Sequence, residues 1–187
     1  MKLVNIKKIA VIADIHANKY ALTTFINYIE SELKVDYILN LGDFLQIGPH
    51  PKVITEVILS DDRFINILGN NEIVITEKAN IETREEELKH RKWIENLLNS
   101  DLLEKVRNLP TSRNLEINNM KLFMVHSRKI DNQFQNTWKL PLLYQGKSLD
   151  DFIKDYPDKA EIILFGHTHE QLFLNRKNKI FVNPGSL

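Results

Sequence analysis

Two histidines that are one residue apart, in the segment Gly166-His167-Thr168-His169, have clear potential for chemistry in this 187-residue chain. They follow the apolar run at residues 162–165, which predicts a buried strand ending at a glycine turn. Open α/β sheets bind ligands at the carboxyl ends of their strands, and histidine is the commonest metal ligand. A His-x-His pair on its own, however, more often marks an ordinary polar loop.

Further candidate ligands also follow predicted strands. Each one alone has an ordinary explanation, because an aspartate can cap a helix, an asparagine can hold a left-handed turn, and a histidine can be a hydrogen-bonded core residue. Seven such residues at the ends of apolar strands are harder to explain in that way. The sequence therefore predicts a shared site at Asp14, His16, Asp43, Asn70, His126, His167 and His169.

The chemistry of this set suits a pair of metal ions. Two divalent ions about 3.5–4 Å apart need a carboxylate that can bridge them, together with neutral imidazoles and amide oxygens. Mixed nitrogen and oxygen ligands suit Mn, Fe, Zn, Co or Ni. The chain has no cysteine, which excludes thiolate ligands, disulfides and a thiol nucleophile.

The N-terminal part alternates strands and helices. Strands are predicted at residues 8–13, 37–41 and 64–68, with helices at 20–33 and 52–59 between them. Right-handed crossovers then predict a parallel sheet whose three polar clusters lie at one edge.

The middle of the chain is predicted as a charged helical excursion at about residues 81–108, with Asp101 as the N-cap of its second helix. A solvated helical pair on the surface explains this region equally well. His50 and His90 lie outside the candidate set and are interpreted as surface residues.

The last third returns to strands. Asn118-Asn119 predicts a two-residue hairpin between strands at 114–117 and 121–125. Residues 127–145 show no clear pattern, 149–156 predict a short helix, and 171–174 and 179–182 predict strands.

Composition limits the function classes. Hydrophobic residues make up 43% of the chain, which predicts a packed core, and a single domain over residues 1–187 is expected. Lys+Arg and Asp+Glu both number 25, which argues against a dedicated nucleic-acid surface. No run approaches the ~20 apolar residues of a membrane span or resembles a signal peptide. We expect a cytoplasmic protein that does not contact a membrane. The sequence is compatible with an oligomer.

The ordered motifs Asp14-x-His16, Gly42-Asp43, Gly69-Asn70, His126, Gly166-His167-x-His169 and Asn183-Pro184-Gly185-Ser186 resemble the calcineurin-like metallophosphoesterases over nearly the whole chain. Residues 14–18 are similar to the Asp-Ile-His-Gly-Asn variant of small prokaryotic phosphodiesterases. The resemblance implies a four-layer α/β/β/α sandwich of two mixed sheets flanked by helices, with a dinuclear metal site at the strand ends.

The resemblance also implies roles for the seven residues. One metal ion would be held by Asp14, His16 and His169, and the other by Asn70, His126 and His167. Asp43 would bridge the two ions, for which Mn is preferred. A hydroxide between the ions would attack phosphorus in line, and Asp43, Asn70 and His126 would serve catalysis.

Three departures from the family pattern matter. Asn71 stands where many members have a histidine that helps to protonate the leaving group, and an amide is no general acid near pH 7. Ala17 replaces the usual glycine, a mild change unless φ is positive there. Members also usually continue for one or two strands past Asn-Pro-Gly-Ser, whereas Leu187 is the last residue here.

The sequence thus predicts a metal-dependent phosphodiesterase acting on a small phosphorylated substrate. A phosphomonoesterase or protein phosphatase on the same site is the first alternative, and Asn71 argues against it only modestly. A non-catalytic interaction module with this fold is the second, although such modules lose ligands and none is lost here. A nuclease is disfavoured by the zero net charge.

Overall fold

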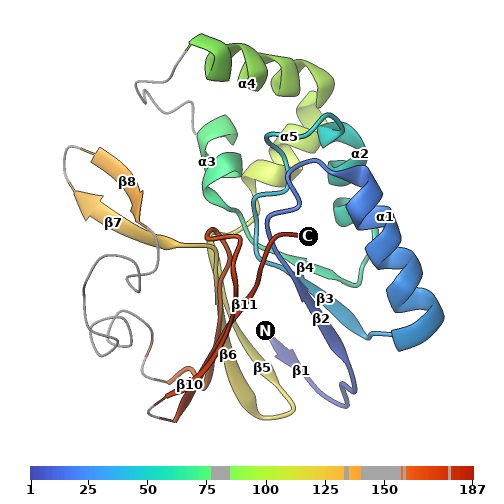
Figure 1. Ribbon diagram of the computed structural model, residues 1–187, viewed down its shortest axis with the longest axis vertical. Coiled ribbons are helices and arrows are strands. Elements are labelled where there is room, and N and C mark those ends of the chain that lie inside the picture. Colours follow the sequence, from blue (N-terminus) through green and yellow to red (C-terminus); the bar gives the residue numbers. More distant parts are fainter. Residues whose placement is uncertain (77–84, 133–134, 140–156, 158, 177) are drawn as a thin grey trace.

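Two β-sheets pack face to face in the computed structural model of the chain, with helices beyond the smaller sheet (Figure 1). The structure describes residues 1–76, 85–132, 135–139, 157, 159–176 and 178–187. The two sheets and their flanking helices confirm the predicted mixed α/β class. The helix predicted at 149–156 lies outside the described residues.

The smaller sheet is parallel and has the order β2-β3-β4, with strands Ile9–Ile12, Tyr37–Asn40 and Phe64–Asn66. Helix α1 (Lys19–Tyr28), which continues as a π-helical turn (Ile29–Leu33), and helix α2 (Pro51–Ser60) connect the strands. This arrangement confirms the predicted β-α-β-α-β unit. Asn18 caps α1, because its side chain accepts a hydrogen bond from the Ala21 N–H at 3.2 Å.

The larger sheet is mixed and has the order β1-β5-β6-β9-β11-β10. Asn118 and Asn119 have φ values of 48° and 70°, which confirms the predicted hairpin turn between β5 and β6. The two-residue strand β1 is too short to leave a sequence pattern. The unassigned region 127–145 contains a separate antiparallel pair, β7 and β8. The strands are Lys2–Leu3 (β1), Ser112–Ile117 (β5), Met120–Val125 (β6), Arg128–Asn132 (β7), Gln135–Lys139 (β8), Ile162–Leu164 (β9), Gln171–Arg176 (β10) and Lys179–Pro184 (β11).

Three further helices follow β4: α3 (Asn70–Thr76), α4 (Glu85–Leu97) and α5 (Ser100–Arg107). The prediction of Asp101 as an N-cap was wrong. Asn99 is the cap of α5, and its side chain accepts a hydrogen bond from the Leu102 N–H at 2.9 Å. Asp101 instead lies in the first turn, where it pairs with Lys105 at 2.8 Å.

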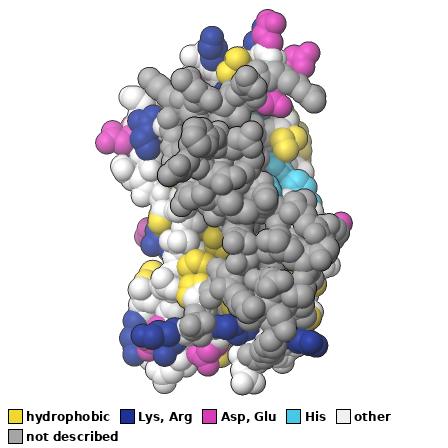
Figure 2. All heavy atoms as spheres, turned by 90° about the vertical axis from the view of Figure 1, so that its left-hand side faces the viewer, with side chains coloured by type: hydrophobic (Ala, Val, Ile, Leu, Met, Phe, Trp, Pro, Cys, Tyr) yellow, Lys and Arg dark blue, Asp and Glu magenta, His cyan; other side chains and the backbone are white. Residues whose placement is uncertain are grey.

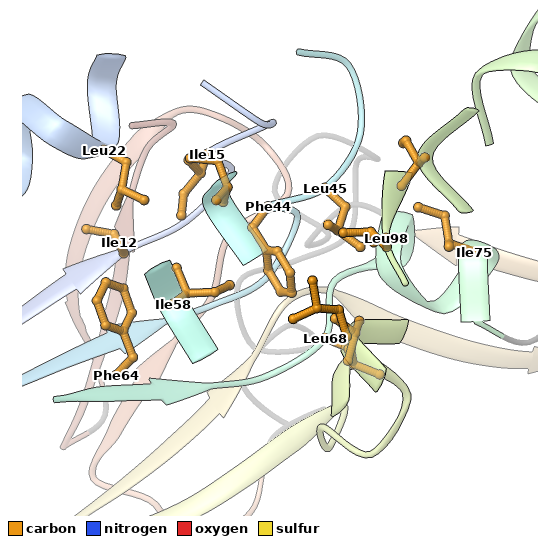
Figure 3. Packing of buried hydrophobic residues seen from close by; sticks show 14 of the residues in the cluster. Ile12, Ile15, Leu22, Phe44, Leu45, Ile58, Phe64, Leu68, Ile75 and Leu98 are labelled. Carbon is orange, nitrogen blue, oxygen red and sulfur yellow. The ribbon is translucent and has the colours of Figure 1, made fainter. Parts of the chain in front are cut away.

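The hydrophobic core has two main parts. One lies between the smaller sheet and its helices, where Ile12, Leu22, Phe44, Ile58 and Phe64 come together (Figure 3). The other lies between the two sheets. Fully burying one such side chain contributes about 1.5–3 kcal/mol, so these clusters hold the strand ends in place.

Among the described residues, no helix combines the length and the apolar composition needed to cross a membrane.

Candidate metal centre

The loops that follow β2 and β3 are bonded to each other by their backbones. The N–H groups of Asp14, His16 and Ala17 donate to the carbonyls of Gly42 at 3.0 Å, Asp43 at 3.0 Å and Phe44 at 2.8 Å. Gly42 has a φ of 96°, and a Cβ there would meet the backbone of Gly69. This close approach brings the ends of β2, β3 and β4 to one place.

The candidate ligands mostly adopt left-handed backbone conformations. Such a conformation costs a non-glycine residue about 1–3 kcal/mol, and it persists only where the surroundings enforce it. Ala17 shares it with a φ of 53°, so replacing the usual glycine there is strained rather than mild. The ligands with positive φ are Asp14 at 55°, His16 at 47°, Asp43 at 56°, His167 at 71° and His169 at 60°.

Asp14, His16 and His169 form a first group, whose ligating atoms all lie within 4.8 Å of one another. The Nε2 atoms of the two histidines are 2.9 Å apart, and His169 Nε2 is 3.5 Å from Asp14 Oδ1. Asp14 is fully buried, whereas the His169 side chain is 47% exposed. Histidine side chains reach the surface on one face of the molecule (Figure 2).

Asp43, His126 and His167 form a second group of the same kind. His126 Nε2 lies 3.2 Å from Asp43 Oδ2 and 3.1 Å from Asn70 Oδ1, so Asn70 adjoins this group. His126 Nε2 is also 3.9 Å from Asp14 Oδ1, which makes the two groups neighbours. The structure thus brings together all seven residues that the sequence singled out.

Two interactions hold Asp43 in place. The Asn71 N–H donates to Oδ1 at 2.9 Å, and the Asn71 side-chain amide donates to Oδ2 at 2.9 Å. Asn71 is therefore committed to orienting a candidate ligand. Sequence reasoning considered this residue only as a missing proton donor.

Glu72 is the important residue that sequence reasoning missed. Its side chain is completely buried, and its carboxylate accepts four backbone N–H groups. Oε2 accepts from Asp43 at 2.8 Å and Gly69 at 2.9 Å, while Oε1 accepts from Phe44 at 2.8 Å and Leu45 at 2.9 Å. One side chain thus ties the loop after β3 to the loop after β4. The signal was present in Gly69-Asn70-Asn71-Glu72, but its partners are backbone groups, which no sequence pattern reveals.

The segment Asn183-Pro184-Gly185-Ser186 supports the histidine loop. The Asn183 amide donates to the Gly166 carbonyl at 3.0 Å and to Thr168 Oγ1 at 2.9 Å. The Ser186 hydroxyl donates to the Asp14 carbonyl at 2.7 Å. These contacts give a structural reason for a motif that contributes no ligand of its own.

His50 and His90 lie outside both groups, in agreement with the sequence. Both are half-buried rather than fully exposed. His90 stacks on Trp93, and its Nε2 accepts a hydrogen bond from the Ile47 N–H at 3.3 Å. It therefore supports the loop after β3 from outside the centre.

The pKa values of several candidate ligands are shifted, because acidic and basic groups are buried beside one another. Burial raises the pKa of Asp14 to about 6. Burial also acts to raise the pKa of Asp43, but the hydrogen bond and the charge of His126 outweigh it and lower that pKa below 3.8. Burial lowers the pKa of His126, yet the hydrogen bond and charge of Asp43, together with Asp14, raise it to about 9. His167 has its pKa lowered to about 4, first by burial and then by the charge of His126.

The residues present fit a pair of cations. Within the described part of the chain, Asp14 and Asp43 form ion pairs with histidines and with no lysine or arginine. Buried carboxylates need such compensation. His126 Nδ1 lies 2.8 Å from the Leu41 carbonyl, which directs Nε2 into the centre, the arrangement usual for a metal-bound histidine. Two imidazole nitrogens 2.9 Å apart, at His16 and His169, are likewise placed to share a cation.

Comparison with known proteins gives the family. The model of the calcineurin-like phosphoesterase superfamily domain matches residues 8–187, and the chain belongs to this superfamily. It is accordingly a hydrolase that acts on phosphoester bonds, in a superfamily that uses divalent metal ions.

Individual relatives are distant. The uncharacterized protein MJ0912 of Methanocaldococcus jannaschii is 23% identical over 198 residues, covering 96% of this chain and 75% of that protein. The crystal structure of a metallophosphoesterase from Sphaerobacter thermophilus has a TM-score of 0.71 at 20% identity, covering 97% of this chain and 77% of that one. A structure described as a novel archaeal phosphodiesterase has a TM-score of 0.56 at 19% identity, covering 96% and 84%. These structures share the fold.

The four hydrogen bonds to Glu72 generate a first prediction. Glu72→Gln keeps the size of the side chain but replaces one carboxylate oxygen by an NH₂ group. The two backbone N–H groups that donate to that oxygen would then face a donor. We expect the free energy of unfolding to fall by about 2–4 kcal/mol, since buried donors lose their acceptor. Denaturant unfolding measures this change. Glu56→Gln, at an exposed i,i+4 pair with Lys52, is the matched control and should stay within about 0.5 kcal/mol. Equal stability of the two variants would contradict the assigned role.

The raised pKa of His126 generates a second prediction, for protein stripped of metal. Because the pKa is about 9 in the folded state and 6.5 in the reference state, protonation stabilises the fold below pH 6.5. That stabilisation is lost as the pH rises through about 9. We expect the free energy of unfolding to fall by roughly 2–3 kcal/mol between pH 7 and 9.5, at about 1.4 kcal/mol per pKa unit. In His126→Gln, the free energy of unfolding should depend less on pH. Identical pH dependence in the two proteins would refute the raised pKa of His126.

Proposed function

We propose that this hydrolase is a metal-dependent phosphodiesterase that acts on small phosphorylated substrates. The observation that carries the proposal is the pair of adjoining ligand groups, centred on His169 and His126, at the carboxyl ends of the strands. Asp14, His16 and His169 would hold one divalent cation, and Asn70, His126 and His167 the other. Asp43 lies beside His126 and would serve both cations.

The bound cations would supply Lewis-acid stabilisation of phosphoryl charge and a hydroxide nucleophile near neutral pH. Nitrogen and oxygen ligands without thiolates suit Mn, Fe, Zn, Ni and Co, and Mn is the first candidate that we propose. The protein's own contribution is to hold the ligands rigidly. Asn71 orients both oxygens of Asp43, the Leu41 carbonyl orients His126, and Glu72 fixes the backbone of the loop.

The position of Asn71 favours diesters that have an acidic leaving group, and it argues modestly against a phosphomonoesterase. The Asn71 amide is bonded to Asp43 and cannot donate a proton to a leaving group near pH 7. A substrate whose leaving group is already acidic needs no such proton. An archaeal phosphodiesterase with a similar fold supports the same choice.

The test compares hydrolysis of bis-p-nitrophenyl phosphate with that of p-nitrophenyl phosphate. Protein stripped of metal receives Mn, Ni, Co, Zn or Mg in turn, while calorimetry measures binding of each ion separately. We expect metal-dependent cleavage that favours the diester. Preference for the monoester would support a phosphomonoesterase instead, and metal binding without turnover of either substrate would support a non-catalytic module.

The place of Asp43 in the second ligand group, beside His126, gives a further prediction. Asp43→Asn should lower metal-dependent turnover at least about 100-fold, because changes in residues that merely support a ligand already cost 10–100-fold. Circular dichroism should show that the fold is retained. His90→Ala is the control outside the centre, where loss of one 3.3 Å hydrogen bond should change turnover less than about threefold. Undiminished activity of Asp43→Asn would exclude the two-cation mechanism, and a large loss in His90→Ala would mean that α4 contributes to catalysis.

A further inference from the structure

Among the described strands of the larger sheet, β10 lies at one end of the order, away from the smaller sheet's helices (Figure 1). Of the described strands, only β11 pairs with it. In an antiparallel pair, alternate residues direct their N–H and C=O groups away from the partner strand. The outer side of β10 therefore presents backbone donors and acceptors that another strand can use.

Between Glu170 and Arg176, this edge lacks the usual protection against pairing. Exposed edge strands are normally guarded by an inward-pointing lysine, a proline or a bulge. The segment Gln171-Leu172-Phe173-Leu174-Asn175 contains no charged residue and no proline, and its register with β11 is continuous. At its centre Phe173 is 72% exposed, which leaves a large apolar side chain in solvent.

The residues along this edge are symmetric by type about Phe173, except that the two ends carry opposite charges. An acidic residue, Glu170, stands at one end and a basic residue, Arg176, at the other, and both are exposed. Between them, two amides flank two leucines, which flank Phe173. Such a sequence is complementary to itself when a second strand runs antiparallel.

We propose that a second copy of this chain pairs with β10, antiparallel and about a two-fold axis at Phe173. The register places Phe173 opposite Phe173 of the second copy, where aromatic side chains on one face contact directly. The same register then aligns every remaining pair by type: Leu172 with Leu174, Gln171 with Asn175, and Glu170 with Arg176.

Charge and register together favour a second copy over an unrelated strand. A shift of the axis to Leu172 would place Phe173 against Gln171 and Glu170 against Leu174. A shift to Leu174 would place Phe173 against Asn175 and Arg176 against Leu172. Only the register centred on Phe173 joins opposite charges, and symmetry makes that ion pair twice. The zero formal net charge of the chain adds no overall repulsion between two copies.

The experiment is sedimentation velocity on the full chain from about 1 µM to about 1 mM, since one strand pair gives a weak, concentration-dependent dimer. Phe173→Lys should abolish the dimer, because like charges would then face each other at the axis. Met120→Lys, on an exposed hydrophobic residue at the β5–β6 hairpin, is the matched control and should leave dimerisation unchanged.

Charge reversal tests the register itself. Glu170→Lys and Arg176→Glu should each raise the dimer Kd by about tenfold. In each variant, positions 170 and 176 carry like charges, and the two-fold axis makes this repulsive pair twice. The double variant Glu170→Lys/Arg176→Glu should restore the Kd to within about threefold of the original. A chain that stays monomeric throughout overturns the proposal and leaves the edge to a strand of another protein. A dimer that is insensitive to Phe173→Lys, or single reversals that the double variant does not rescue, would overturn it as well.

Discussion

Burial of three carboxylates that follow β2, β3 and β4 is the constraint on which this structure depends. Asp14, Asp43 and Glu72 are all shielded from water, with exposures of 0%, 2% and 0%. Burial without compensation would make each of them costly in the charged form. At Glu72, four backbone N–H groups offset part of this cost and set the course of the loops after β3 and β4. Burial, followed by the charge of Asp43, still raises the pKa of Glu72 to about 7. Asp14 and Asp43 each accept a backbone N–H as well, from His167 and Asn71, but they also pair with imidazoles. This difference separates the carboxylate that supports the fold from the two that face the centre.

Backbone strain and hydrogen bonds between loops occur at the same strand ends. Five ligands adopt left-handed conformations that cost each of them free energy. The backbone bonds between the loops of β2 and β3, and the Asn183 and Ser186 contacts, hold these conformations. Rigid placement of ligands is what metal-assisted hydrolysis requires of a protein, because the ligands then need little reorganisation during the reaction.

Much of the fold and of the candidate site could be predicted, because the sequence patterns that indicate them are local. Apolar runs predicted the strands of the smaller sheet, and Asn118-Asn119 predicted a hairpin. The seven candidate ligands stood out because each follows a strand. What could not be predicted involves backbone partners or tertiary geometry. Asp101 resembles a cap as much as Asn99 does, and only the path of the chain decides between them. The role of Glu72 depends on N–H groups up to 29 residues away, and the strain at Ala17 depends on a φ value.

The hydrogen bond from Ser186 to Asp14 joins residues 172 positions apart, and His16 meets His169 across 153 positions. Contacts of such sequence separation carry a large entropic cost of loop closure, which slows folding. The parallel sheet β2-β3-β4 can assemble from the first 66 residues, but the centre at its edge cannot. An ion held between His16 and His169 would therefore bind the fold in which these distant segments have met, and it would stabilise that fold by mass action.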